Sequence, residues 1–437
     1  MSDTVETVSD PSEPASPEAI ELAAASPSGE LLVDSLGDYV QSWIRRIRSG
    51  DSGALPILIG LAVIVVIFQS QAPKFLSAGN LVNLLVEAAV FVLLGMGEIY
   101  ALLLSEIDLS IGFVAAVGAF VVGETITSPY NWPWWGGALF GLGVCAVIGA
   151  LQGTIITRLH IPSFVVTLGG LLGFEGLMIY VADRDKAAVG GVINISTTSP
   201  IYKLVNSNIG PAASWISLVV VLALFAAVTI LSAARRRARG LSAPPLSITL
   251  IKIAVTAVAG AVIVAICNVN RGFLTPLRGV PWVVVYVLVI LLAWSLLLSK
   301  TRLGRYIYAI GANPEAARRA GINVSMVRTF AFAMSSLTAG LAGIAYESRL
   351  GSMATDVDGG TLVLFAVAAA VIGGTSLFGG RGKPIHALLG GLVIAAVANG
   401  LALVNVSAAG QYMATALVLV AAVAVDSLVR RRGSTPS

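Results

Sequence analysis

The sequence predicts an all-α, polytopic transmembrane helical bundle of about 10–12 spans, with broken or re-entrant helices and both termini cytoplasmic. Composition, the length of the apolar stretches and the placement of the basic residues support this fold class. Hydrophobic residues make up 57% of the 437 residues and charged residues 11%, whereas soluble domains carry roughly 45–50% and about 25%. Most of the chain is therefore expected to be surrounded by lipid.

Apolar stretches of roughly 20 residues, the length that crosses a hydrocarbon core of about 30 Å, recur over a transmembrane domain at 55–429. We predict spans at 55–70, 81–104, 109–127, 136–157, 163–181, 213–233, 247–267, 281–299, 328–347, 361–377, 385–405 and 411–429. Gly and polar residues interrupt 109–127 and 361–377, which makes these two segments candidates for broken or re-entrant helices.

Basic residues cluster at the ends of apolar segments, which indicates topology signals and not a nucleic-acid surface. With both termini inside, 20 of the 27 Lys and Arg residues fall in the cytoplasm. Residues 1–30 are acidic and Ser/Pro-rich, which predicts a disordered tail without a cleavable signal peptide. Residues 31–54 are predicted to form an amphipathic lead-in at the membrane interface, with a solvated lead-in as the alternative. Residues 430–437 are predicted to form a cytoplasmic tail.

Small residues and one polar segment shape the expected packing. Glycines four apart, at Gly137 and Gly141, Gly149 and Gly153, and Gly169 and Gly173, predict close helix contacts. The polar stretch from Asp183 to Pro211 is expected outside, where it is a plausible docking surface for an extracytoplasmic partner. The two cysteines, Cys145 and Cys267, lie in apolar runs, which excludes a disulfide framework.

Acidic residues at membrane depth are costly and are functional candidates by default. Five qualify: Glu87, Glu98, Glu106, Asp108 and Glu175. Between Ser105 and Gly112, two carboxylates and two hydroxyls stand together, which predicts a helix break. Ser105 or Asp108 could cap the next helix, or the residues could line a translocation path. The path candidates are Glu98, Glu106, Asp108 and Ser110.

A short helix with both start and stop signals is predicted between two clearly apolar spans, on the side of the membrane that is rich in Lys and Arg. Its residues are Asn313, Pro314, Glu315, Ala316, Ala317, Arg318, Arg319, Ala320 and Gly321. Asn313 can cap it, Pro314 suits the first turn, the charges suit the helix dipole and Gly321 can end it. It is only about 10 Å long. Such a helix fits either a groove on another protein or a surface connector.

The sequence carries no phosphate-binding loop, since its Gly382-Lys383 pair lacks the spaced upstream Gly and the following Ser or Thr. No catalytic residue, metal site or bound cofactor is predicted, and His160 and His386 are expected at span ends. Energy for any work must therefore come from a partner or from an ion gradient.

Four segments resemble the permease subunits of ribose/xylose-type ABC sugar importers, in the expected order from Asn80 onward. They are Ile107–Gly112, Pro162–Gly170, Asn313–Ile322 and Val371–Gly382. Glu106 before Ile-Asp-Leu-Ser, and the long region from Asp183 to Pro281, are similar to the xylose-permease branch. The acidic tail and Met353–Asp358 do not match the family pattern.

The resemblance implies a multi-pass cell-membrane subunit, not an enzyme, that carries a monosaccharide such as xylose or a related pentose. It implies that Asn313–Gly321 is a coupling helix docking into a cytoplasmic ATPase subunit, which uses ATP and Mg²⁺. It also implies a second permease copy, an extracytoplasmic sugar-binding protein, contact with membrane lipid, and no nucleic acid. The alternative is a secondary, proton-coupled transporter of a small polar solute, with Glu106 or Asp108 protonated in each cycle.

Overall fold

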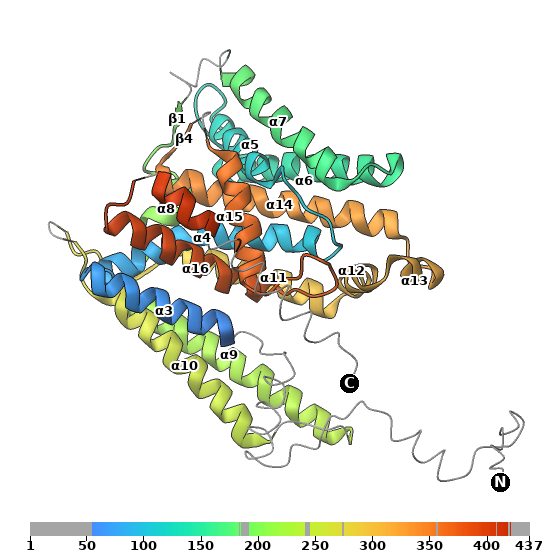
Figure 1. Ribbon diagram of the computed structural model, residues 1–437. Helices are drawn as coiled ribbons and strands as arrows, with labels where there is room; N and C mark the ends of the chain where they lie inside the picture. Colours follow the sequence, from blue (N-terminus) through green and yellow to red (C-terminus); the bar gives the residue numbers. More distant parts are fainter. Residues whose placement is uncertain are drawn as a thin grey trace, which may run out of the picture.

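A computed structural model of the chain describes residues 55–182, 184, 192–240, 245–272, 275–354, 357–407, 409–417 and 420. Its architecture is a bundle of long α-helices with two short β-ribbons (Figure 1). The tail predicted over 1–30, the lead-in over 31–54 and the tail over 430–437 lie outside the described residues.

Eight of the described helices are long and apolar enough to cross a membrane. They are α4 (Ala78–Leu102), α6 (Trp134–Leu159), α7 (Ser163–Ala182), α9 (Pro211–Ala238), α10 (Leu246–Asn268), α11 (Trp282–Lys300), α14 (Val324–Leu350) and α16 (Pro384–Leu403). Three apolar helices are shorter: α3 (Leu55–Gln71), α5 (Ile111–Ile126) and α15 (Gly359–Ile372). Each of these helices overlaps a predicted span, and the last predicted span, 411–429, is helical where it is described, at 411–417 and 420. The polytopic helical bundle is therefore confirmed.

The helices α5 and α15 correspond to the two interrupted spans. With 16 and 14 residues, they are about 24 and 21 Å long, shorter than a hydrocarbon core of about 30 Å. Among the described residues, eight helices are thus both long enough and apolar enough to cross a membrane, whereas 10–12 spans were predicted. Re-entrant geometry and the cytoplasmic placement of both termini stay predictions.

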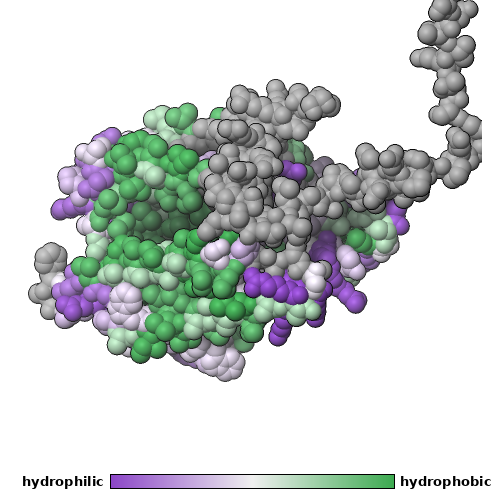
Figure 2. Space-filling view, turned by 90° about the horizontal axis from the view of Figure 1, so that it is seen from below, coloured by the Kyte–Doolittle hydropathy of each residue, from purple (hydrophilic) through white to green (hydrophobic). Residues whose placement is uncertain are grey.

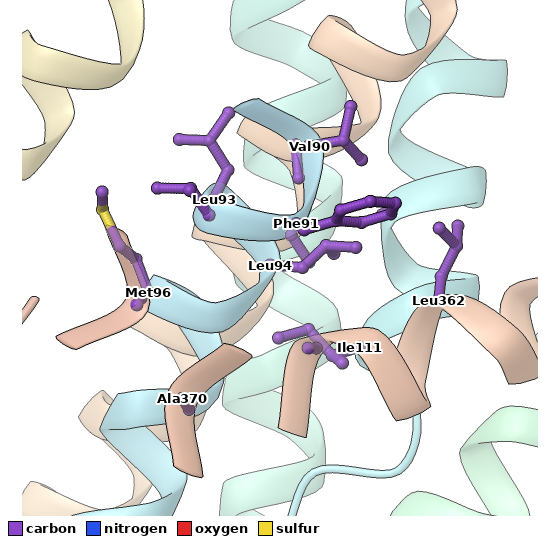
Figure 3. Close-up of a cluster of buried hydrophobic side chains, with 14 of the residues drawn as sticks. Val90, Phe91, Leu93, Leu94, Met96, Ile111, Leu362 and Ala370 are labelled. Carbon is purple, nitrogen blue, oxygen red and sulfur yellow. The ribbon is translucent and has the colours of Figure 1, made fainter. Parts of the chain in front are cut away.

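The helix α4 forms the centre of the bundle, since 78% of its most apolar 18-residue stretch is buried. It packs against α14, α15 and α16. Side chains from several sides of α4 enter one large apolar core (Figure 3), among them Val90, Phe91, Leu93, Leu94 and Met96. Ile111 of α5 and Leu362 of α15 belong to the same core. This packing holds the end of α4 in place, and the helix is interrupted there before α5 begins.

The helices α9 and α10 pair with each other at one edge of the bundle (Figure 1). Only 6% and 11% of their apolar stretches are buried. Apolar side chains cover the middle of the face that carries them, whereas hydrophilic ones gather toward its ends (Figure 2). This surface has the character expected of a lipid-facing one. The helix α7 lies at the opposite edge in Figure 1 and is likewise largely exposed.

Two short ribbons join distant parts of the chain. Strand β1 (Val192–Asn194) pairs antiparallel with β4 (Ser352–Ala354), with Ile193 opposite Met353. Strand β2 (Asn208–Ile209) pairs antiparallel with β3 (Val280–Pro281). Between β1 and β2, the helix α8 (Pro200–Asn206) is fastened to α14, because the Asn206 amide donates to the carbonyl of Ser348 at 2.5 Å. The predicted polar loop before Pro211 is thus partly folded onto the bundle.

The predicted glycine contacts form at α6 but not at α7. A Cβ on Gly149 would meet the carbonyl oxygen of Phe332, and one on Gly153 would lie 2.7 Å from the Cα of Thr329, so α6 and α14 approach closely. In contrast, a Cβ on Gly169 or Gly173 would meet nothing within 4 Å. Within the described residues no element packs against these two glycines, so their expected part in helix packing stays a prediction.

Candidate functional site

The break between α4 and α5 is a tight, hydrogen-bonded turn. After Leu103, the residue Ser105 adopts a positive φ of 61°, and the Glu106 amide donates back to the carbonyl of Ala101 at 3.1 Å. The N-cap position of α5 is Ser110, whose side chain makes no capping bond. The prediction that Ser105 or Asp108 holds the N-cap position is therefore wrong, although the Asp108 side chain does accept from the amide of Ser110.

Asp108 is the centre of a buried hydrogen-bond network. Its Oδ1 accepts from the amide of Ser110 at 3.1 Å and from the Ser110 hydroxyl at 2.7 Å. Its Oδ2 accepts from the hydroxyl of Ser335 on α14 at 2.9 Å. All three side chains are fully buried. A buried carboxylate oxygen without a hydrogen-bond donor costs free energy. The donors from Ser110 and Ser335 therefore explain how the Asp108 carboxylate is tolerated in the interior.

The network continues to α6 and reaches α7. The Gln152 amide of α6 donates to the Ser110 hydroxyl at 2.9 Å. The Thr167 hydroxyl of α7 donates to the carbonyl of Ile107 at 3.3 Å. The absence of a side chain at Gly170 lets α7 approach Ser110 and Gln152 closely. Segments from α5, α6, α7 and α14 thus converge on the break.

Glu98 approaches the break from α4. Its Oε1 accepts a hydrogen bond of 3.2 Å from the amide of Asp108, while its Oε2 is buried and has no hydrogen-bond partner among the described residues. The hydroxyls of Tyr100 and Ser336 are also buried without a partner there. Of the path candidates, Glu98, Asp108 and Ser110 are therefore brought together in the packed interior, fully buried.

Glu106 lies apart from that interior group. Its Oε1 pairs with a terminal guanidinium nitrogen of Arg328 at 3.3 Å, and the two side chains are 14% and 28% exposed. Arg328 stands in the first turns of α14. A surface cleft of about 460 Å³ opens beside this region, between the end of α6 and the start of α14, and includes Arg158, Asn323 and Thr329 in its lining. None of the four path candidates lines this cleft.

The predicted short helix is present as α13 (Pro314–Arg319), after α12 (Arg302–Ala312). The Asn313 side chain accepts from the amides of Glu315 and Ala316 at 3.1 and 3.0 Å. At the other end, Gly321 has a φ of +81°, and the amide of Ile322 donates to Ala317 at 3.1 Å, as in a Schellman ending. Each predicted start and stop residue therefore acts as expected.

The outer surface of α13 is charged, and its inner surface is anchored. Glu315 pairs with Arg318 at 3.0 Å and with Arg319 at 3.3 Å, and all three side chains are more than half exposed. Ala317, in contrast, is buried. The helix therefore presents a compact group of charges at one end of the bundle, beside α12 (Figure 1).

A glycine-rich segment after α15, residues 373–382, connects α12 with the break. The amide of Gly380 donates to the carbonyl of Leu103 at 2.9 Å, and the Ser105 hydroxyl donates to the carbonyl of Phe378 at 2.8 Å. On its other side, the Tyr308 hydroxyl of α12 donates to the carbonyl of Gly382 at 2.6 Å. A Cβ on Gly311 would collide with the Leu103 carbonyl. α12, the glycine-rich segment and the break are thus in direct contact.

Sequence reasoning missed two polar residues of this region, and a buried carboxylate farther along α14 near Gly123. Ser335 and Gln152 are ordinary residues within apolar helices, and only the fold brings them to Ser110 and Asp108. Glu347 of α14 is fully buried, and both its carboxylate oxygens have no hydrogen-bond partner among the described residues. A lone carboxylate in an apolar run was the signal that could have found Glu347. The described residues contain no group of three or more His, Cys, Asp or Glu that could hold a metal ion.

Comparison with known proteins identifies the family. The family model described as "Branched-chain amino acid transport system / permease component" matches residues 80–423. The xylose transport system permease protein XylH of Escherichia coli (strain K12) is 32% identical over 86% of this chain and 92% of its own length. The D-allose transport system permease protein AlsC and the ribose import permease protein RbsC of the same strain are each 29% identical, over 85% and 89% of this chain and 90% and 96% of their own lengths. No solved structure matches the chain.

Proposed function

This chain belongs to the family of branched-chain amino acid transport system permease components, and we propose that it is the transmembrane permease subunit of a binding-protein-dependent ABC importer for a monosaccharide. Xylose or a related pentose is the proposed cargo. The observation that carries the proposal is the similarity, along 85–89% of the chain, to permeases named for xylose, allose and ribose. ATP hydrolysis takes place in a separate ATPase subunit, which holds ATP and Mg²⁺.

The proposed division of labour assigns Asn313–Gly321 to the ATPase. A helix of six residues is only marginally stable alone in water. The helix α13 is held by caps at both ends and by the buried Ala317. It can therefore move as a unit and pass on a displacement caused by the ATPase. The contacts of α12 with the glycine-rich segment, and of that segment with Leu103 and Ser105, offer a short route to the break. A displacement of α13 is therefore proposed to alter the region of Glu98, Glu106, Asp108 and Ser110.

Further partners belong to the same proposal. An extracytoplasmic sugar-binding protein delivers the cargo to the side that carries α8 and the β1–β4 ribbon, and a second copy of this chain completes the membrane-embedded part. Lipid surrounds the exposed apolar helices α9 and α10. The proposed selectivity lies mainly in the binding protein, because a hydrated path with hydroxyls and carboxylates accepts many polyols.

Reconstitution tests the proposal. The chain, its ATPase and its sugar-binding protein would be placed in proteoliposomes, and uptake of labelled xylose, ribose and allose measured with and without ATP. We expect ATP-dependent uptake that requires all three components, with xylose or another pentose preferred. Uptake by the chain alone, driven by a proton gradient, would instead establish a secondary transporter and overturn the proposal.

A further inference from the structure

The acidic residue Glu175 is exposed at a position along α7 that corresponds to the middle of the membrane. Glu175 lies twelve residues after the start of α7, which places it about 18 Å along a helix of about 30 Å. Its side chain is exposed, and it has no hydrogen-bond or ion-pair partner among the described residues. The other acidic residues described within the apolar helices are buried or half-buried: Glu87, Glu98, Glu124 and Glu347.

Exposure alone does not set α7 apart, because α9 and α10 are equally exposed. The difference is charge. The apolar stretch of α9 has no charged residue before Arg235, and the one charged residue of α10, Lys252, stands close enough to the helix end for its long side chain to reach the interface. A carboxylate that faces hydrocarbon in mid-membrane is strongly disfavoured. The side of α7 that carries Glu175 therefore faces something polar.

The surface around Glu175 is open. The exposed side of α7 also carries the glycines Gly169, Gly173 and Gly176, each roughly 100–160° around the helix from Glu175, and a Cβ on any of them would meet nothing within 4 Å. Glycines on an exposed helix face remove the side chains that would otherwise cover its backbone. A small polar solute could thus approach both the carboxylate and the helix.

A neighbouring side of α7 is fastened to the buried network, since Thr167 lies roughly 80° around the helix from Glu175. Thr167 donates to the carbonyl of Ile107, and Gly170 lies against Ser110 and Gln152. The helix α7 therefore contacts the hydrogen-bonded break on one side and carries the exposed Glu175 carboxylate close to the edge of that side.

We propose that the exposed face of α7 forms a wall of the aqueous passage for the sugar, and that the Glu175 carboxylate accepts hydrogen bonds from sugar hydroxyls. The inference rests on the proposed function as a sugar permease. A neutral polyol suits this site because a carboxylate accepts several hydrogen bonds at once, and a monosaccharide offers neighbouring hydroxyl donors. The passage thereby lies in front of α7, and the buried residues Glu98, Asp108 and Ser110 form its support.

Chemical labelling tests the aqueous exposure. In the assembled importer, a Glu175→Cys variant would be treated with a hydrophilic, membrane-impermeant thiol reagent, with and without saturating xylose. The matched control is Val221→Cys in α9, which is also exposed; the native Cys145 and Cys267 are buried. We expect Glu175→Cys to react at least tenfold faster than the control, and xylose to slow it. Equal rates for the two variants, or a disulfide between two copies through position 175 without labelling, would overturn the inference.

Transport measurements test the role of the carboxylate. Glu175→Leu should lower kcat/KM for uptake about tenfold or more, the loss expected for a hydrogen-bonded charged group, and Glu175→Gln, which keeps one acceptor oxygen, should lose less. Val221→Ala in α9, which lies outside the proposed passage and is also exposed, should transport normally. ATPase stimulation by the binding protein shows that each variant assembles. If the native complex takes up sugar and Glu175→Leu does so equally well, the inference is overturned but the proposed function stands. If the native complex takes up no sugar, the proposed function itself is overturned.

Discussion

The Ser335 hydroxyl donates a hydrogen bond of 2.9 Å to Oδ2 of Asp108, although 227 positions separate the two residues in the chain. The bond joins the break after α4 to α14, a helix that begins only a few residues after α13. Asn323 caps α14 by accepting from the amide of Met326 at 3.0 Å. The charged short helix and the buried network are therefore connected by a single continuous helix as well as by the glycine-rich segment.

Removal of the Ser335 hydroxyl tests the energetic importance of that bond. In Ser335→Ala, Oδ2 of Asp108 stays buried and loses its donor, so we expect a loss of stability of about 1–3 kcal/mol. The measurement is thermal unfolding of the purified chain in detergent. Ser336→Ala is the matched control, because the Ser336 hydroxyl is buried without a partner among the described residues, and it should unfold at or above the native temperature. Equal destabilisation by both changes would contradict the assignment.

Gly311→Ala tests the contact between α12 and the break. The added Cβ would strike the carbonyl oxygen of Leu103 and lie 2.6 Å from the amide nitrogen of Gly380, so α12 must move away at a cost of about 1–3 kcal/mol. We expect sugar uptake to fall while ATP hydrolysis by the assembled complex persists. Gly143→Ala in α6, where a Cβ meets nothing within 4 Å, should leave both activities unchanged. Parallel loss of uptake and hydrolysis in Gly311→Ala would indicate failed assembly and not lost coupling.

Glu315→Lys tests the coupling role of α13. The exchange replaces the partner of Arg318 and Arg319 with a third cation, but exposed ion pairs contribute only about 0–1 kcal/mol, so membrane insertion and stability should change little. Uptake in proteoliposomes should nevertheless be uncoupled from ATP hydrolysis, because the charge presented to the ATPase is reversed. Glu315→Gln, which removes the charge without reversing it, should retain part of the uptake. Unchanged uptake in Glu315→Lys would mean that α13 is only a connector.

The helices could be predicted from the sequence because apolar length is a local property. The interruption of 109–127 and 361–377 was also local, since Gly and polar residues stand in those segments, and α5 and α15 are indeed short. The β1–β4 ribbon could not be predicted, because its two strands are too short to have a pattern and pair only after the bundle has brought them together.

The same distinction applies to the functional region. Asn313 and Gly321 were predictable because caps act within one turn of their own helix. Ser335 and Gln152 were not, because their importance comes from contacts with Asp108 and Ser110 on other elements. The N-cap position expected of Asp108 is held by Ser110, and the Asp108 oxygens accept from Ser110 and from Ser335 of a helix distant in sequence. Gly169 and Gly173 have the spacing of a packing motif, but no described residue lies within 4 Å of a Cβ built on either.

The ion pair of Glu106 and Arg328 offers a test by double-mutant cycle. The pair is partly buried, and Nε of Arg328 is buried without a hydrogen-bond partner among the described residues, so loss of Glu106 leaves this cation poorly compensated. We expect Glu106→Gln and Arg328→Gln each to destabilise the chain by about 1–3 kcal/mol, and the double variant by less than their sum, with a coupling energy of about 1–2 kcal/mol. Unfolding in detergent measures all three, and strictly additive losses would mean that the two side chains do not interact.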